Sequence, residues 1–382
     1  MVSITKLYCG AEETFDQLRY RTNARERKPV VVWNLTRRCN LFCKHCYAAS
    51  NAEKNDREEI SKEEAKLTID DLSSFGIPVL LFSGGEPLLR EDIFELFDYA
   101  QKKGIRTVLS TNGTLITEEV AKKLKKVGVS YVGISLDGIG EVNDIFRGKN
   151  GAFEMAKQGI INCKKSNIKV GIRFTINREN FGQIPAILDF FEKEGVDRIC
   201  FYHLVYSGRG KNLMTLDLTH EERRQIMDYI LVRAKEIFTK NGKIEVLTVD
   251  NHADGPYVYL KLLKEDPKRA NEVYELLSKN EGNLSGIGIA CIDESGNVYP
   301  DQFFRDLKLG NIRERPFSAI WSDESNEMLV QLRNKKLYIK GRCSKCKFLH
   351  ICGGNFRARA YQKTKDFWAP DPQCYLTDEE IL

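Results

Sequence analysis

The chain has 382 residues, of which 42% are hydrophobic and 30% are charged, a composition typical of a folded globular protein. No apolar run reaches the roughly 20 residues that a membrane span needs, and the N-terminus lacks a signal-peptide pattern. We therefore expect a cytoplasmic protein with no membrane partner. The formal net charge of +5 is spread along the chain rather than gathered in a stripe, which does not favour a nucleic-acid partner.

From residue 30 to about residue 236, short apolar runs alternate with amphipathic stretches. Six strands are predicted, at residues 30–36, 78–85, 106–113, 131–138, 169–176 and 198–205. Ser61 and Glu64 form a capping box that opens one of the intervening helices, and Thr117 opens another that ends at Gly128. Strands that alternate with helices build a parallel sheet with right-handed crossovers. Six such units, against the eight of a closed TIM barrel, predict an α/β fold of the partial (β/α)6 barrel type.

The predicted domain boundaries follow changes in this pattern. Residues 1–29 form an N-terminal extension, and residues 30–236 form the partial barrel. Residues 237–285 form a connecting segment, with one more possible strand in KIEVLTVDN and a charged helical stretch at 256–280. Residues 286–382 form a cysteine-bearing C-terminal domain, in which ESGNVYP predicts a small hairpin. Functional groups of such a barrel lie at the C-terminal strand ends, where SGGEP, STNGT and SLDG occur.

Seven of the 11 cysteines fall in two groups, which is unusual for a chain expected in the reducing cytoplasm, where disulfides are rare. Cys39, Cys43 and Cys46 lie just past the first predicted strand, in the pattern Cys-x3-Cys-x2-Cys. Three thiolates on one loop can hold three corners of a 4Fe-4S cluster and leave the fourth iron open to another ligand. A zinc site prefers four protein ligands, and the nearest candidate for a fourth is His45. The spacing favours the cluster, with a zinc loop as the alternative.

The first cysteine group, followed directly by Tyr47, resembles the signature of the radical S-adenosylmethionine (SAM) superfamily, and the resemblance extends over residues 30–236. It implies that the reduced cluster splits bound SAM into methionine and a 5′-deoxyadenosyl radical, which abstracts a hydrogen atom from the substrate. It also implies contacts with SAM at the strand ends. These contacts are Tyr47 near the adenine, Gly84, Gly85 and Glu86 at the amino group, Asn112 and Ser135 at the ribose, and Arg173 at the carboxylate.

The second cysteine group consists of Cys343, Cys346, Cys352 and Cys374. With Gly353-Gly354-Asn355 directly after its third member, it resembles the auxiliary-cluster domains (SPASM and the shorter twitch type) of many radical SAM enzymes. Four thiolates would fully ligate an auxiliary 4Fe-4S cluster, which suits electron transfer or a structural role better than SAM cleavage. A four-cysteine zinc site is the alternative. Cys291 stands alone and lacks partners for a further cluster, so we expect a buried or near-site thiol there.

Three segments near the C-terminus, at residues 248–257, 288–304 and 343–360, resemble segments of the tetrapyrrole-modifying radical SAM enzymes. FYHLVYSGRG at the sixth strand adds to this resemblance. Within the subgroup, the N-terminal KLYCG…LRY stretch and the cysteine-containing GIACID segment favour the 12,18-didecarboxysiroheme deacetylases of the alternative haem pathway. This resemblance implies an iron-tetrapyrrole substrate that loses two acetate side chains to give Fe-coproporphyrin III. It also implies a low-potential electron donor, such as ferredoxin or flavodoxin.

Candidate substrate residues come from the chemistry of such a macrocycle. Its carboxylates need cationic partners, for which Arg209, Arg357 and Arg359 are candidates. His203 and His252 are candidates to donate a proton or to ligate the substrate iron. Aromatic candidates for the lining of a flat pocket are Phe303, Phe304, Tyr257 and Tyr259. Each has an ordinary alternative, namely a surface arginine, a hydrogen-bonded core histidine or a packed aromatic ring.

Three other functions stay open on the sequence alone. The related enzyme of haem d1 synthesis would act on propionates of the same substrate. A SPASM-type peptide-modifying maturase would share both domains, although the chain has neither the extra auxiliary cysteines nor the peptide-recognition domain that such enzymes usually carry. A zinc-stabilised binding protein would use both cysteine groups structurally. Iron, sulfide and zinc content separate this last function from the enzymatic ones.

Overall fold

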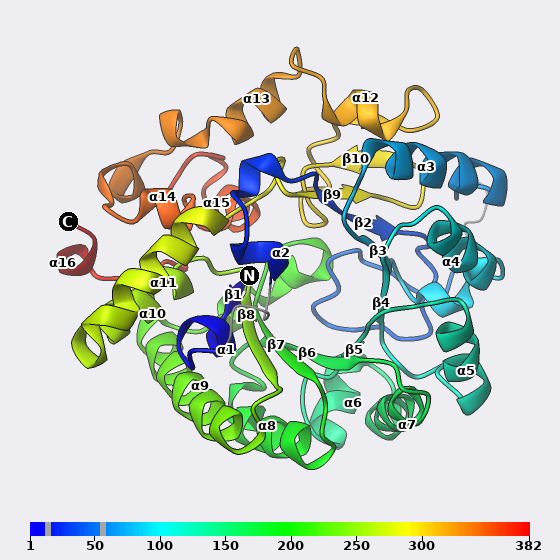
Figure 1. The fold of residues 1–382 in the computed structure, drawn as a ribbon, viewed down its shortest axis with the longest axis horizontal. Coiled ribbons are helices and arrows are strands. Elements are labelled where there is room, and N and C mark those ends of the chain that lie inside the picture. Colours follow the sequence, from blue (N-terminus) through cyan, green and yellow to red (C-terminus); the bar gives the residue numbers. More distant parts are fainter. Residues whose placement is uncertain (12–16, 54–58) are drawn as a thin grey trace.

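A computed structural model describes residues 1–11, 17–53 and 59–382 of the chain. Within these residues, the strands form one 11-stranded sheet in the order β1-β8-β7-β6-β5-β4-β3-β2-β9-β10-β11. The sheet curls into an incomplete barrel, with helices around its outer face and the C-terminal segments packed along one side (Figure 1). The predicted partial barrel is therefore confirmed.

All six predicted strands are present and parallel. They are β2 (Val30–Asn34), β3 (Leu80–Ser83), β4 (Thr107–Thr111), β5 (Val132–Ser135), β6 (Val170–Ile176) and β7 (Arg198–His203). The further strand expected in KIEVLTVDN is β8 (Glu245–Val249), which pairs in parallel with β7. At this edge the sheet is thus longer by one parallel strand than the six predicted units, because the chain after α9 returns to the sheet.

Both edges of the sheet are completed by segments predicted to lie outside the barrel. At one edge, β1 (Val2–Ser3) runs antiparallel to β8. At the other edge, β9 (Ile289–Ile292) runs parallel to β2 and forms the predicted hairpin with β10 (Asn297–Tyr299), followed by β11 (Gly310–Asn311). Strands from all four predicted segments therefore share one sheet, and their boundaries at residues 29, 236 and 285 stay a proposal.

Helices cover the outer face of the barrel. They are α3 (Lys62–Phe75), α4 (Ile93–Lys102), α5 (Glu118–Lys126), α6 (Glu141–Arg147), α7 (Ala152–Lys165), α8 (Ile184–Lys193) and α9 (His220–Asn241). The predicted capping box is confirmed, because the Ser61 side chain accepts from the Glu64 amide and the Glu64 carboxylate accepts from the Ser61 amide. Thr117 caps α5 in the predicted place.

Shorter elements and the C-terminal helices complete the chain. The α-helices are α1 (Ile4–Leu7), α2 (Gln17–Tyr20), α10 (Asp254–Glu265), α11 (Pro267–Asn280), α12 (Phe317–Trp321), α13 (Glu327–Arg333), α14 (Leu349–Cys352), α15 (Arg357–Thr364) and α16 (Asp378–Ile381). The 3-10 turns are Ala24–Glu26, Pro87–Leu89, Phe181–Gln183, Gly208–Leu216, Lys335–Leu337 and Gly341–Lys345. None of the described helices combines the length and apolar composition that a membrane span requires.

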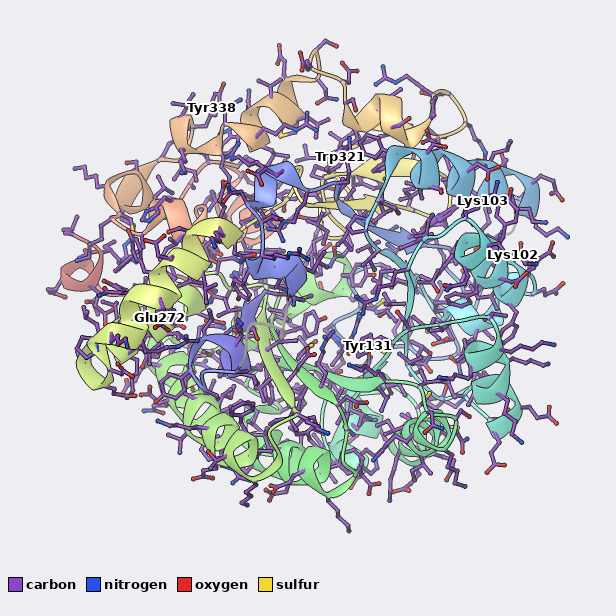
Figure 2. All side chains as sticks on the ribbon, in the orientation of Figure 1. Lys102, Lys103, Tyr131, Glu272, Trp321 and Tyr338 are labelled. Atoms are coloured by element: carbon purple, nitrogen blue, oxygen red, sulfur yellow. The ribbon has the colours of Figure 1, made fainter. Side chains whose placement is uncertain are left out.

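The two faces of the barrel sheet differ in chemistry. Successive side chains of a strand point to opposite faces, so Trp33 and Phe82, paired in register, both pack into the layer between sheet and helices. On the inner face, Val79, Val108 and Tyr131 form an apolar cluster toward the N-terminal strand ends, and Tyr131 is seen within the ring of strands in Figure 2. Polar side chains occupy the inner face toward the C-terminal ends, which leaves that end of the barrel for chemistry.

A buried arginine ties the C-terminal domain to this end of the barrel. Arg359 of α15 is fully buried and donates two hydrogen bonds to the Asp371 carboxylate, at 2.9 and 2.8 Å. The same guanidinium donates to the carbonyl oxygens of Leu204, after β7, and Asp250, after β8, each at 3.0 Å. A buried ion pair of this kind fixes position because either charge left alone in the interior is costly.

Candidate active site

The first cysteine group lies on a loop between β2 and α3, at the C-terminal end of the barrel. Cys39 and Cys43 are buried and Cys46 is half-buried. Two N–H donors face the sulfurs: Asn112 Nδ2 lies 3.9 Å from Cys39 Sγ, and Arg147 Nη1 lies 3.6 Å from Cys43 Sγ. Burial raises the pKa of the Cys39 thiol to about 12, so a bound metal must replace its proton. Three soft donors with N–H groups aimed at sulfur fit an iron–sulfur cluster.

The two glycines of SGGEP are required by the cysteine loop itself. Gly84 has φ +136°, and a Cβ there would come within 2.7 Å of the Thr36 carbonyl oxygen. A Cβ on Gly85 would overlap the Arg38 carbonyl group. The Gly85 amide donates to the Thr36 carbonyl at 2.7 Å, and the Glu86 amide donates to the Arg38 carbonyl at 2.8 Å. The end of β3 is thus fastened to the backbone that leads into Cys39.

Glu86 joins the ends of β3 and β4. Its fully buried carboxylate accepts hydrogen bonds from Thr111 Oγ1 at 2.8 Å, from the Asn112 amide at 2.9 Å and from the Leu88 amide at 3.1 Å. Burial raises the pKa of Glu86 to about 7, against the opposing effect of these donors. Glu86 therefore positions Asn112, the residue beside Cys39, and its predicted contact with the amino group of SAM stays a prediction.

Tyr47 turns its hydroxyl toward the ends of β2 and β3. It donates to Asn34 Oδ1 at 2.9 Å and lies 3.3 Å from Ser83 Oγ. The Tyr47 ring meets the Phe303 ring edge-on, with centroids 5.2 Å apart. Tyr47 is thus held at the ends of two strands. Its contact with Phe303 also packs the C-terminal domain against the cysteine loop.

The remaining predicted SAM contacts lie on neighbouring strands. Asn112 donates to Asn40 Oδ1 at 2.8 Å, which holds it on the cysteine loop. Ser135 of β5 and Arg173 of β6 are paired in register, so they lie side by side at the same level of the barrel. Arg173 donates to Ser110 Oγ at 2.6 Å, and a Cβ on Gly133 would collide with its guanidinium. Gly133 therefore lets Arg173 extend across β5 inside the barrel.

Sequence reasoning missed a charged group beneath the cysteine loop. Asp137, after β5, is fully buried and pairs with Arg147 of α6 at 2.6 Å, while Arg147 also faces Cys43. His45 Nε2 lies 3.6 Å from the same carboxylate, and burial lowers the pKa of His45 to about 4. The signal available was weak: Asp137 lies in the strand-end motif SLDG, but nothing in the sequence joins Arg147 to Cys43.

Arg209 has a different setting from the one expected. It was a candidate partner for a substrate carboxylate, yet its Nε donates to the Cys43 carbonyl and its Nη1 to the Ser50 carbonyl, each at 2.8 Å. Its guanidinium also lies over the Phe42 ring, 4.1 Å from the centroid. Arg209, which lies after the end of β7, therefore holds the cysteine loop by hydrogen bonds to its backbone. The preceding Gly208 is needed because a Cβ there would overlap the carbonyls of Cys46 and Tyr47.

Arg357 and Arg359 are neither surface residues nor free to meet a carboxylate. Both are fully buried. Arg357 donates to the carbonyl oxygens of Phe367, Ala369 and Gly354, as Arg359 does to Asp371 and two strand-end carbonyls. Because their guanidinium groups are buried and bonded within the protein, the expected contact of this pair with substrate carboxylates is not seen. The two arginines instead link segments of the C-terminal domain.

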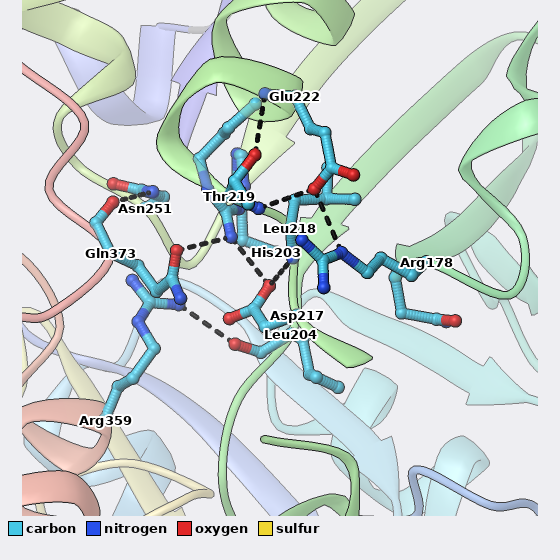
Figure 3. Close-up of polar contacts among 12 residues, drawn as sticks. Arg178, His203, Leu204, Asp217, Leu218, Thr219, Glu222, Asn251, Arg359 and Gln373 are labelled. Carbon is cyan, nitrogen blue, oxygen red and sulfur yellow. Dashed lines mark hydrogen bonds and ion pairs between the residues drawn. The ribbon is translucent and has the colours of Figure 1, made fainter. Parts of the chain in front are cut away.

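The two candidate histidines have opposite surroundings. His203 pairs in register with Ile176 on the helix side of the sheet. Its Nε2 donates to the Asp254 carboxylate at 2.8 Å, and its Nδ1 accepts from Arg223. The network around it, with Asp217, Gln373 and Arg359, is drawn in Figure 3. Both nitrogens of His203 are therefore engaged by protein, on the face of the sheet turned away from the cysteine loop.

His252, in contrast, follows β8 at the C-terminal end of the barrel, and neither of its ring nitrogens has a hydrogen-bonding partner among the described residues. Its backbone amide donates to Asn355 Oδ1 at 2.6 Å. Its ring lies nearly parallel to Phe356, with centroids 6.5 Å apart, and Phe356 in turn packs on Phe303 at 5.4 Å. Through Phe303 and Tyr47 this row of rings reaches Cys46.

The second cysteine group is brought together as predicted. Cys343, Cys346, Cys352 and Cys374 line one small cavity with Phe348 and Asn355. Gly353 and Gly354, with φ of +66° and +78°, turn the chain sharply after Cys352. Cys291 is buried apart from this group, beside Asn34, whose Nδ2 lies 3.5 Å from its sulfur. Among the described residues, no group of three or more His, Cys, Asp or Glu side chains is arranged to hold a single metal ion.

Comparison with known proteins agrees with this geometry. The Radical SAM superfamily matches residues 33–191, and the SPASM iron-sulfur cluster-binding domain matches residues 286–347, which includes Cys343 and Cys346. The chain is a radical SAM enzyme with a SPASM domain, and it uses SAM, a 4Fe-4S cluster and an auxiliary iron–sulfur centre. The zinc-protein alternative is thereby set aside.

The relatives define the subgroup. The chain is 56% identical over 395 residues to Fe-coproporphyrin III synthase of Methanosarcina barkeri, covering 100% of this chain and 99% of that one. It is 44% identical to pre-heme d1 synthase of Dinoroseobacter shibae, covering 92% of this chain and 87% of that one. It therefore belongs to the tetrapyrrole-modifying subgroup of the radical SAM superfamily. Streptococcus suis SuiB bound to its precursor peptide SuiA shares the fold, with a TM-score of 0.71 at 19% identity, over 92% of this chain and 76% of that chain.

The contact of Gly85 with the cysteine loop gives a direct test. Gly85→Ala places a methyl group against the Arg38 carbonyl, so the loop must shift and the first cluster loses its geometry. We expect at least a hundredfold loss of SAM cleavage and a changed electron paramagnetic resonance (EPR) spectrum on adding SAM, measured anaerobically on reconstituted protein.

The matched control is Gly182→Ala, because a Cβ at Gly182 meets no atom within 4 Å. This variant is expected to keep the cluster and the activity of the parent. Unchanged SAM cleavage in Gly85→Ala would mean that the strand end and the loop are not coupled as described.

Proposed function

We propose that this chain removes the two acetate side chains of 12,18-didecarboxysiroheme to give Fe-coproporphyrin III, as a cytoplasmic enzyme of haem biosynthesis. The observation that carries the proposal is the 56% identity, over essentially both full lengths, to a protein named for making that product. The pre-heme d1 synthase relative, at 44% identity, supports a second candidate, removal of propionate carbons from the same macrocycle. The higher identity to the Fe-coproporphyrin III synthase favours the deacetylase reaction.

The residues around the cysteine loop supply the setting for this chemistry. When bound, SAM and the reduced cluster provide a 5′-deoxyadenosyl radical that abstracts a hydrogen atom from substrate. Cys39, Cys43 and Cys46 would hold the cluster. Tyr47, Gly84, Gly85, Glu86, Asn112, Ser135 and Arg173 would hold SAM or the groups that touch it. The glycine contact and the Arg209 hydrogen bonds keep the loop in place, and Glu86 fixes Asn112 beside Cys39.

His252 is the histidine that we propose as a ligand of the substrate iron. Burial, together with nearby positive charge that includes Lys335 and Arg359, holds the pKa of His252 well below its ordinary range. The imidazole is therefore neutral at pH 7, which is the form that ligates iron. Its ring nitrogens have no hydrogen-bonding partner among the described residues, and the aromatic row His252–Phe356–Phe303–Tyr47 leads to the cysteine loop. A flat macrocycle ligated at His252 would lie along these rings.

The substrate test is an anaerobic reaction with SAM, a reductant and 12,18-didecarboxysiroheme, followed by mass spectrometry. We expect loss of two acetate groups and formation of Fe-coproporphyrin III. Loss of propionate carbons instead would favour the haem d1 type of reaction. Cleavage of SAM with an unchanged tetrapyrrole would refute both, and the peptide-modifying alternative would then be tested next.

The role of His252 is tested by spectroscopy rather than turnover. Binding of 12,18-didecarboxysiroheme to the parent is expected to produce the optical and EPR signature of a histidine-ligated iron. His252→Ala is expected to lose that signature and to regain it when imidazole is added, because free imidazole replaces the missing ligand.

His220→Ala serves as the control, because His220 is exposed on α9 and bonds the Pro372 carbonyl. It is expected to leave the spectrum unchanged. An unaltered spectrum in His252→Ala would remove His252 from the substrate site while leaving the deacetylase proposal standing.

A further inference from the structure

A basic segment surrounds two ligands of the second cysteine group. Residues 335–347 (KKLYIKGRCSKCK) contain six basic side chains and no acidic one. Four of the lysines, Lys336, Lys340, Lys345 and Lys347, are exposed. Cys346, which lies between the last two, is the half-buried member of its group, whereas the other three cysteines are buried. The second cysteine group therefore comes nearest to the surface at Cys346, within this basic segment.

Part of this charge is not neutralised within the protein. Lys340 pairs with Asp366 at 2.9 Å, and Arg342 pairs with Asp378 at 2.8 Å. Lys336 and Lys345 form no ion pair among the residues that the structure describes. The surface around Cys346 thus carries positive charge that is free to attract an acidic partner.

A groove adjoins the basic segment and shares a wall with the cysteine cavity. Its volume is about 720 Å³, and it is lined by residues of α10 and α11 together with Lys347 and Phe348. Glu272, on the outer side of α11, lies at the periphery of the molecule in Figure 2. Phe348 also lines the cavity of the four cysteines. A group seated in this groove is therefore separated from the second cysteine group by the Phe348 side chain.

We propose that the basic segment 335–347 and the adjoining groove form the docking surface for an acidic, low-potential electron-transfer protein. The carrier would give up one electron to the auxiliary centre, which is reduced by one electron and passes it on to the SAM-binding cluster. Positive charge steers the acidic carrier, and Phe348 lines both the groove and the cavity of the cysteines. This inference rests on the family assignment and on the proposed need for a reductant, but not on the identity of the tetrapyrrole.

The same surface is less suited to the carboxylates of the substrate. The groove is lined by residues of α10 and α11 with Lys347 and Phe348. Tyr47, in contrast, contacts Asn34 and Ser83 at the C-terminal ends of β2 and β3. Radical chemistry requires the substrate to lie close to the cysteine loop.

The first test compares two ways of reducing the holoenzyme, with SAM present and no tetrapyrrole. Lys336→Glu/Lys345→Glu is expected to slow cluster reduction by flavodoxin hydroquinone by about tenfold or more at low ionic strength, because steering becomes repulsion. Formation of 5′-deoxyadenosine with saturating dithionite is expected to stay at the level of the parent. The control is Lys122→Glu/Lys126→Glu on α5, at the opposite edge of the molecule, with little expected effect on either reaction (Figure 1).

Equal rates with flavodoxin for the two double variants would overturn the proposal. A second measurement uses the unaltered protein, because a substitution next to Cys346 could damage the auxiliary centre and slow its reduction for that reason alone. Carbodiimide cross-linking to flavodoxin, read by mass spectrometry, is expected to join its carboxylates to Lys336, Lys345 or Lys347. Cross-links confined to other faces would contradict the proposed surface. Neither result depends on didecarboxysiroheme, so the deacetylase proposal is judged separately.

Discussion

The close approach of two backbones at the C-terminal end of the barrel is the constraint on which the site depends. The end of β3 and the start of the cysteine loop are joined by two amide-to-carbonyl hydrogen bonds, at 2.7 and 2.8 Å, which side chains on Gly84 and Gly85 would prevent. The Glu86 carboxylate, which follows this contact in the chain, accepts a hydrogen bond from the Asn112 amide. Arg209, which lies after β7, donates a hydrogen bond to the Cys43 carbonyl of the loop. These contacts hold the loop on which Cys39, Cys43 and Cys46 pack in one small cluster. Three thiolates on one loop would leave the fourth corner of a 4Fe-4S cluster open to SAM.

The sheet explains why the chemistry of both cysteine groups belongs to one folded unit. β8 and β1 extend one edge and β9 to β11 extend the other, so the C-terminal domain continues the barrel rather than hanging from it. Arg359 of that domain donates hydrogen bonds to the carbonyls of Leu204 and Asp250, which follow β7 and β8. The Phe303 ring of the same domain packs against the Tyr47 ring. The row of rings from His252 to Tyr47 therefore lies between the barrel and the SPASM domain, where a large flat substrate would meet both.

Much of this could be predicted from the sequence because the relevant signals are local. The spacing of the first three cysteines and the strand-end glycines are contained within a few residues, and each strand and helix of the barrel has its own local pattern. The contacts of side chains that bond backbone carbonyls could not be predicted, because a carbonyl partner leaves no mark in the sequence. Arg209, Arg357 and Arg359 all belong to this class. His203 and His252 were indistinguishable until the register with Ile176 put His203 on the helix side. Arg147 was missed because only the turn of α6 brings it to Cys43.

Two separate cysteine groups would each hold a cluster, and only the cluster of the first group would react with SAM. The measurement that tests this most directly is iron and sulfide analysis of anaerobically prepared protein, with EPR before and after SAM. We expect about eight irons per chain for the parent and about four for the Cys39→Ala/Cys43→Ala/Cys46→Ala variant, whose remaining signal does not respond to SAM. Zinc without sulfide, or a variant that still cleaves SAM, would contradict it.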